Sequence, residues 1–153
     1  MVRCASLVLV LVAAGCVDTS KCHAPVDWKP CAGESAEPGS SGSPPSIVQL
    51  TLPTCAYLDS PTVMASVHVS DPDGDAQVLK ISLYTSGLHN NETDVALADV
   101  GRSGNDWSGQ VALTISGAAG GMPMEGSSDV RIKVTDRAGA QSVPYCNSVA
   151  IVR

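Results

Sequence analysis

Short runs in which apolar and polar residues alternate fill most of the chain after residue 46. In "TVMASVHVS", the apolar residues Val63, Ala65, Val67 and Val69 fall on one face, and the residues between them fall on the other. This period of two is typical of a strand with one buried face. The same pattern in "VLKISLY", "WSGQVALTI" and "DVRIKVTD" predicts three further inward-facing sets: Leu79, Ile81 and Leu83; Trp107, Val111, Leu113 and Ile115; and Val130, Ile132 and Val134.

Three weaker segments extend this pattern. They are "IVQLTL" (47–52), "DVALADV" (94–100) and "NSVAIV" (147–152). Turn residues bound each run, so the chain is expected to form about seven strands and no helix. The apolar residues are largely β-branched and Phe is absent, which favours two thin packed sheets.

A different hydrophobic pattern opens the chain. Arg3 is followed by "ASLVLVLVAA" at residues 5–14, about ten apolar residues, whereas a bilayer span needs about 20. A basic start and a short apolar run predict a secretory signal peptide over residues 1–15.

The letters "AAGC" at residues 13–16 resemble the lipobox of bacterial lipoproteins, with Ala13 where that family prefers leucine. The resemblance implies cleavage before Cys16 and fatty acids such as palmitate on that residue, and two or three acyl chains hold a protein stably on a membrane. The alternatives are a buried cysteine in a hydrophobic helix or an uncleaved anchor. By resemblance to the sorting rule of enteric bacteria, Val17 in place of Asp implies the outer membrane of a bacterial cell envelope.

The net charge of the chain restricts the classes of partner that it can bind. Its formal net charge is -6, and removal of residues 1–15 takes away Arg3, which leaves eight basic residues against fifteen acidic ones. Such an acidic chain is a poor partner for nucleic acid.

The segment "AGESAEPGSSGSPPS" (32–46) is made almost wholly of Gly, Pro, Ser, Ala and Glu. It cannot bury enough apolar surface to offset the entropy of ordering itself. We therefore expect a lipidated flexible tether over residues 16–46 and a folded domain over residues 47–153.

Four cysteines remain if Cys4 leaves with the signal peptide and Cys16 carries lipid. An even number in an exported chain predicts disulfides. Three pairings are possible, and sequence proximity favours Cys22 with Cys31, closing a small loop in the tether, and Cys55 with Cys146. A zinc site at Cys22, His23 and Cys31 is a weaker alternative, because it lacks a C-x-x-C pair and a fourth ligand.

The order "SPTVMASVHVSDPDGDAQVLKISLY", "DWSGQVALTI" and "DVRIKVTDRAGAQS" resembles the bacterial immunoglobulin-like domains, which are akin to fibronectin type III modules. The similarity covers roughly residues 46 to 153. It implies a seven-stranded Greek-key β-sandwich that serves as a spacer or binding module, without catalysis. Since this fold carries many unrelated roles, it does not identify a partner.

"DPDGD" places carboxylates at Asp71, Asp73 and Asp75. As an EF-hand it fails, because Ala76 replaces the glycine and Ser82 the bidentate glutamate that the calcium loop requires. The pattern favours a tight turn, in which Pro72 sets φ and Gly74 accepts a positive φ.

In a sandwich of this type the loops after the second, fourth and sixth strands gather at one end. That arrangement would bring "DPDGD", "GRSGND" and "TDRAG" together. The carboxylates would then repel one another, be neutralised by Arg102 and Arg137, or bind a hard cation. Calcium is the cofactor hypothesis that this leaves open, with four candidate ligands: Asp71, Asp73, Asp75 and Asp136.

Catalysis finds little support in the sequence. No serine lies in a G-x-S-x-G elbow, and the histidines are scattered: His23 in the tether, His68 on the polar face of a strand and His89 in a loop. "NET" at residues 91–93 is expected to be a polar loop. A carbohydrate platform needs exposed aromatic side chains, which are scarce; Trp107 falls on the core face and Trp28 in the tether.

The sequence therefore predicts no enzyme. It predicts a membrane-anchored envelope lipoprotein whose immunoglobulin-like module meets a protein or envelope partner or serves as a spacer. The alternatives are an accessory or inhibitory subunit of a secreted enzyme, and a small module that binds carbohydrate or calcium.

Overall fold

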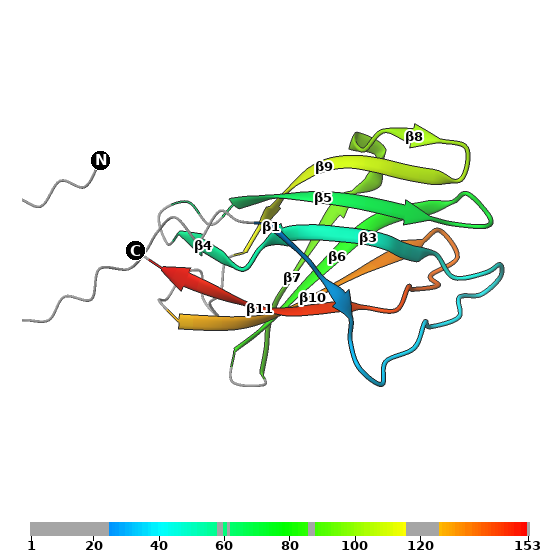
Figure 1. Ribbon diagram of the computed structural model, residues 1–153. Coiled ribbons are helices and arrows are strands. Elements are labelled where there is room, and N and C mark those ends of the chain that lie inside the picture. The colour runs from blue at the N-terminus through cyan, green and yellow to red at the C-terminus, as the bar shows by residue number, and fades with distance from the viewer. Residues whose placement is uncertain (1–24, 58–59, 61, 86–87, 116–125, 153) are drawn as a thin grey trace, which may run out of the picture.

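A computed structural model describes residues 25–57, 60, 62–85, 88–115 and 126–152, without the side chains of residues 83–85 and 88–91. They form two packed sheets (Figure 1). The first sheet has the order β1 (Pro25–Asp27), β3 (Ser46–Pro53), β5 (Thr62–Ser70), β9 (Asp106–Thr114) and β8 (Arg102–Ser103). The second has the order β2 (Lys29–Pro30), β11 (Tyr145–Val152), β10 (Gly126–Asp136), β6 (Ala76–Thr85) and β7 (Leu88–Ala96), and β4 (Cys55–Tyr57) lies beside β11.

The alternating pattern predicted the inner faces of the sheets. All four inward residues of β5 are buried, and Trp107 and Leu113 of its neighbour β9 and Ile132 and Val134 of β10 in the opposite sheet are at most 3% exposed. Leu79 and Ile81 are buried as predicted, and the side chain of Leu83, predicted to lie with them, is outside the described part. Among the described residues seven strands are eight residues or longer, as expected: β3, β5, β6, β7, β9, β10 and β11.

The first long strand changes sheets. β3 pairs antiparallel with β5, and after a bend at Thr54 the chain continues as β4, which pairs parallel with β11. Because this segment is hydrogen-bonded first to one sheet and then to the other, it closes the core along the side where β3 and β11 lie.

Two local expectations are corrected around β7. The strand ends at Ala96 and is followed by a 3-10 turn over Leu97–Asp99, so residues 94–100 are not one strand. Leu97 and Val100 are buried, and a turn brings both side chains inward where a continuous strand would alternate them. The polar loops expected at His89 and at residues 91–93 lie instead within β7, which is paired with β6.

The tether expected over residues 16–46 is wrong for residues 25–46, which pack on the sandwich as a strap. Trp28 is 2% exposed and donates its backbone N–H to Leu50 O at 2.8 Å. Further on, Glu37 bridges to Gln141 and Ser40 donates to Ala138 O. The expected tether rested on composition alone. A segment poor in apolar residues can still be ordered by backbone hydrogen bonds to a neighbouring sheet edge.

Both predicted disulfide pairings are also wrong. Cys31 is bonded to Cys146, with Cα atoms 5.1 Å apart, because β2 lies directly beside β11 and brings the strap to the last strand. The zinc alternative fails for the same reason, since the Cys31 sulfur is already bonded. Cys55 is disulfide-bonded as well. Cys4, Cys16, Cys22 and His23 lie outside the described residues.

No helix in the described part of the chain is long and apolar enough to cross a membrane. The predicted signal peptide over residues 1–15 falls outside that part.

Candidate functional site

Three loops gather at one end of the sandwich, as the sequence predicted. Asp71 N donates to Asn105 O at 3.0 Å, and Asn105 Nδ2 donates to Pro72 O at 2.8 Å. The third loop joins through Arg137 N, which donates to Asp75 O at 3.1 Å. We call this the loop end, made of residues 71–75, 101–105 and 136–140.

Asp71 organises the "DPDGD" turn. Its side chain is fully buried, and its two carboxylate oxygens accept the backbone N–H groups of Asp73 and Asp75, each at 3.0 Å. Gly74 has a φ of 72°, and its N–H bonds back to Asp71 O. A left-handed backbone at this position favours glycine. The motif therefore forms the tight turn that the sequence predicted.

The other carboxylates of the loop end have separate surroundings. Asp136 is 4% exposed and accepts the N–H of Ala140 at 2.8 Å. Asp73 accepts the N–H of Ser43 in the strap. The pKa of Asp75 is raised above its usual value of 3.8, first by desolvation and then by the charges of Asp136 and Asp71.

The four predicted calcium ligands therefore lie at one end, and three of them accept backbone N–H groups. Within the described residues, no three Asp, Glu, His or Cys side chains are placed to hold one ion. The structure uses these four carboxylates, Asp71, Asp73, Asp75 and Asp136, as turn residues. Thermal unfolding in chelator and in calcium tests directly whether they bind the ion.

Arg102 does not pair with these carboxylates in any contact that the structure describes. Its Nη2 donates to Gly74 O at 2.7 Å and its Nε to Gly104 O at 2.8 Å. The guanidinium also lies 4.6 Å from the ring centroid of Trp107, an attractive cation–π distance. The arginine thus fastens two loops through their carbonyl groups.

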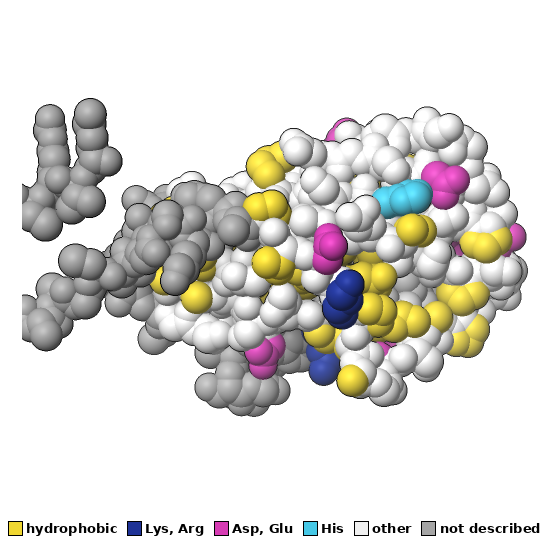
Figure 2. Space-filling model, viewed as in Figure 1, with side chains coloured by type: hydrophobic (Ala, Val, Ile, Leu, Met, Phe, Trp, Pro, Cys, Tyr) yellow, Lys and Arg dark blue, Asp and Glu magenta, His cyan; other side chains and the backbone are white. Residues whose placement is uncertain are grey.

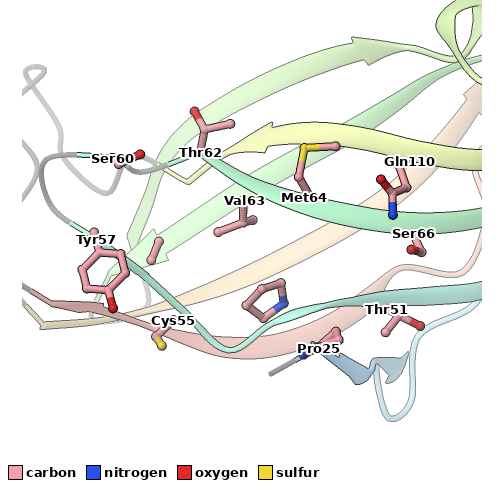
Figure 3. A pocket seen from close by; sticks show the side chains of 12 residues that line it. Pro25, Thr51, Cys55, Tyr57, Ser60, Thr62, Val63, Met64, Ser66 and Gln110 are labelled. Atoms are coloured by element: carbon pink, nitrogen blue, oxygen red, sulfur yellow. The ribbon is translucent and has the colours of Figure 1, made fainter. Parts of the chain in front are cut away.

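A groove opens at the opposite end of the sandwich (Figure 3). It has a volume of about 360 Å³. Its floor includes the buried residues Ala56 and Val63, and the thioether of Met64, 53% exposed, stands at its rim. The described lining carries hydroxyl, amide and apolar groups and no ionisable side chain apart from a tyrosine and a bonded cysteine: Pro25, Thr51, Pro53, Cys55, Ala56, Tyr57, Ser60, Thr62, Val63, Met64, Ser66 and Gln110.

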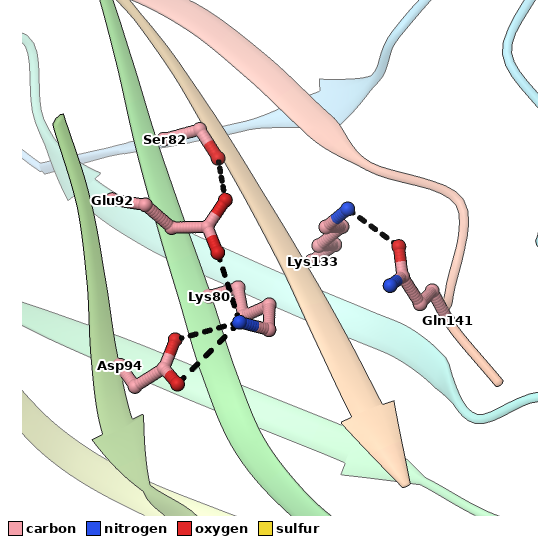
Figure 4. A network of polar contacts seen from close by, with 6 residues as sticks. All are labelled: Lys80, Ser82, Glu92, Asp94, Lys133 and Gln141. Atoms are coloured by element: carbon pink, nitrogen blue, oxygen red, sulfur yellow. Dashed lines mark hydrogen bonds and ion pairs between the residues drawn. The ribbon is translucent and has the colours of Figure 1, made fainter. Parts of the chain in front are cut away.

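A polar network covers the outer face of the second sheet (Figure 4). Lys80 Nζ lies 2.9 Å from Glu92 and 3.1 Å from Asp94, and Ser82 donates to Glu92 at 3.3 Å. The hydrogen bond from Lys80 is the main cause that lowers the pKa of Glu92, and the bond to Glu92 is the main cause that raises the pKa of Lys80. Nearby, Lys133 donates to Gln141. Lys80 and Ser82 of β6 thus bind Glu92 and Asp94 of β7, so this network joins two neighbouring strands.

The outer face of the first sheet offers uncharged polar groups. Figure 2 views this face, over which charged side chains are sparse. His68 lies on it as predicted, with Nε2 3.6 Å from Asp106 Oδ1 and both side chains well exposed. An exposed pair at this distance is weak.

The two tryptophans occupy the two sides of the core. Trp107 is buried as predicted, whereas the burial of Trp28 was missed because it lies within the apparent tether. The run "DWKPC" (27–31) held one signal for it, since a tryptophan side chain carries a large apolar surface that is favourable to bury. Tyr145 is half-buried, donates to Ile47 O at 2.9 Å and has a pKa raised by desolvation.

No known protein family and no curated protein matches the sequence. Two solved structures are similar in fold. A Niemann-Pick type C2 protein from the Japanese carpenter ant is 5% identical, with a TM-score of 0.50 over 75% of this chain and 98% of that one. The PKD domain of an M14-like peptidase from Thermoplasmatales archaeon SCGC AB-540-F20 is 18% identical, with a TM-score of 0.44 over 74% of this chain and 100% of that one.

At such identity the likeness concerns the fold alone. The chain is an all-β, two-sheet sandwich of the immunoglobulin-like kind, which confirms the predicted fold class.

Proposed function

We propose that this chain is a bacterial envelope lipoprotein, anchored through lipid on Cys16, whose immunoglobulin-like module presents its loop end to a protein or envelope partner without catalysing a reaction. The observation that carries the proposal is the position of Pro25. It pairs with Pro53 at the groove end of the sandwich, opposite the loop end.

Simple lengths support this orientation. Pro25 lies nine positions after Cys16, so Pro25 can stand at most about 30 Å from Cys16. The nine residues of β5 add about 30 Å of sandwich beyond that point. The loop end would thus face away from the membrane, where a partner can reach it.

The polar groups of the described chain support a binding role over catalysis. The most buried carboxylates, Asp71 and Asp136, accept backbone N–H groups. The charged groups of the second sheet pair with one another. A general acid or base needs a free functional atom at a substrate site, and these groups are occupied in holding turns and strands.

Fatty-acid labelling tests the anchor. Cells given a clickable fatty acid should label the wild-type protein and not the Cys16→Ser variant. Labelling that survives this substitution, or a wild-type protein that takes no label, would refute the anchor.

Photo-crosslinking tests the loop end. Ser103 at the loop end and Ser60 at the groove end are both exposed serines, so a photo-reactive side chain at each makes a matched pair. We expect a crosslinked partner from position 103 and none from position 60. Crosslinks from position 60 alone would reverse the proposed orientation, and none from either would favour a spacer.

A further inference from the structure

We propose that Cys55 is joined to Cys22 by a disulfide, which fastens the N-terminal strap to the sandwich at a second point. Cys55 is disulfide-bonded and 8% exposed at the start of β4. The other two cysteines of the described part, Cys31 and Cys146, are bonded to each other. The partner of Cys55 therefore comes from residues 1–24, which hold Cys4, Cys16 and Cys22.

The register of β1 selects among these three. β1 runs antiparallel to β3, with Pro25 opposite Pro53 and Asp27 opposite Thr51. Pro53 lies two residues before Cys55 in the sequence, and Cys22 lies three residues before Pro25. Three residues span at most about 10 Å, and a disulfide requires Cα atoms about 4.4–6.8 Å apart.

The groove supports the same choice. Pro25 and Cys55 both line it, so the first described residue of the strap and the bonded sulfur of Cys55 lie at the same groove (Figure 3). Cys16 is nine residues and Cys4 twenty-one residues from Pro25. Cys22 closes the shortest connection and needs the least ordering of the chain.

Formation of this bond is a two-electron oxidation. The Cys22 and Cys55 thiols lose two protons and two electrons to the disulfide of a thiol oxidoreductase in the exporting compartment, and one S–S bond forms. Removal of residues 1–15 would then leave Cys16 as the one cysteine outside a disulfide, which is the state that lipidation requires. That last consequence rests on the proposed function, whereas the disulfide does not.

Non-reducing peptide mapping of the full chain tests the bond. Cleavage before Asp and after Glu puts each of the four cysteines on its own peptide, with residues 18–26, 27–34, 35–58 and 136–153. We expect peptide 18–26 linked to peptide 35–58. The link between peptides 27–34 and 136–153, which the structure already shows, is the internal control.

Two variants complete the test. Cys22→Ser should free one alkylatable thiol, at Cys55, and keep the control link. Cys16→Ser should leave the link between peptides 18–26 and 35–58 unchanged even though it abolishes lipid labelling. Free thiols at both Cys22 and Cys55 in the wild type, or a link from peptide 35–58 to Cys4 or Cys16, would overturn the disulfide. Loss of lipid labelling by itself would bear on the anchor alone.

Discussion

Cys31, in the strap before the first long strand, is bonded to Cys146 in the last strand, and 115 positions separate them. The bond therefore encloses most of the folded chain. It holds β2 against β11 at an edge of the second sheet where only two residue pairs connect these strands.

Breaking this bond should destabilise the protein strongly. Loop-closure entropy gives a disulfide of this span about 4–5 kcal/mol, and native disulfides of small exported domains are worth about 2–5 kcal/mol. We expect the double variant Cys31→Ser, Cys146→Ser to lose about 3–5 kcal/mol in urea unfolding. A loss below about 1 kcal/mol would mean that the strap is held by its other contacts.

Trp28 should account for much of the strap's packing. Its indole is 2% exposed, and truncation of a buried tryptophan costs about 3–5 kcal/mol. We expect Trp28→Ala to lower the free energy of unfolding by that amount. Trp28→Phe should cost much less, since Trp28 Nε1 has no hydrogen-bond partner among the described residues and its loss leaves nothing unpaired.

Val26→Ala is the matched control, because Val26 lies in the same strap and is 38% exposed. Equal costs for the alanine variants at positions 26 and 28 would show that the strap is not packed as described.

Gly39 tests the far part of the strap. A Cβ at this position would lie 2.5 Å from Ala140 N and 2.7 Å from Ala138 O, and backbone atoms cannot move aside as a flexible side chain can. We expect Gly39→Ala to destabilise the protein by about 1–3 kcal/mol, as overpacking does. Gly33→Ala should be milder, because its Cβ would meet no atom within 4 Å and only its φ of 77° opposes it. A larger loss at position 33 would contradict the described path.

Asp75 should reduce stability at neutral pH. Its pKa is raised in the folded state, so the folded protein binds this proton more tightly than the unfolded chain does. Stability from this group is therefore highest below its unfolded value of 3.8 and falls as pH rises through the folded pKa. We expect Asp75→Asn to raise the unfolding midpoint at pH 7 and to change it little at about pH 3.

Glu92 is the control of opposite sign. Its pKa is lowered, so its contribution is present above its unfolded value of 4.5 and is lost as pH falls through the folded pKa. Glu92→Gln should lower the midpoint at pH 7, and the difference should vanish in acid. The same sign of change for both variants at pH 7 would contradict the assigned surroundings of these carboxylates.

Calcium should leave the protein unaffected. Because the oxygens of Asp71 already accept N–H groups of its own turn, we expect equal midpoints in chelator, in calcium and in magnesium. A calcium-specific rise in the midpoint would show binding to the folded state and would restore Asp71, Asp73, Asp75 and Asp136 as ligands. Asp71→Ala should cost about 1–3 kcal/mol in all three solutions, because two N–H groups of the turn lose the buried carboxylate that accepts them.

Period-two alternation was sufficient to predict the long strands other than β7, together with their buried faces. In β5 each inward residue is a small or β-branched apolar one, and a shift by one residue would expose all four. The gathering of the three loops also followed from the sequence, once the resemblance supplied the order of strands. The "DPDGD" turn was predicted because proline and glycine act locally, within the same few residues.

The strap could not be predicted in this way. Residues 32–46 contain almost no apolar side chains, and what orders them is hydrogen bonding to residues about a hundred positions away, such as Ser40 with Ala138. Sequence proximity likewise favoured the wrong disulfides, because it measures distance along the chain. The sequence by itself determined the sandwich, its inner faces and its turns, since these depend on local periodicity and local backbone preference. The tertiary structure alone decided that Trp28 is core and that Cys31 meets Cys146, because both depend on which strands become neighbours in space.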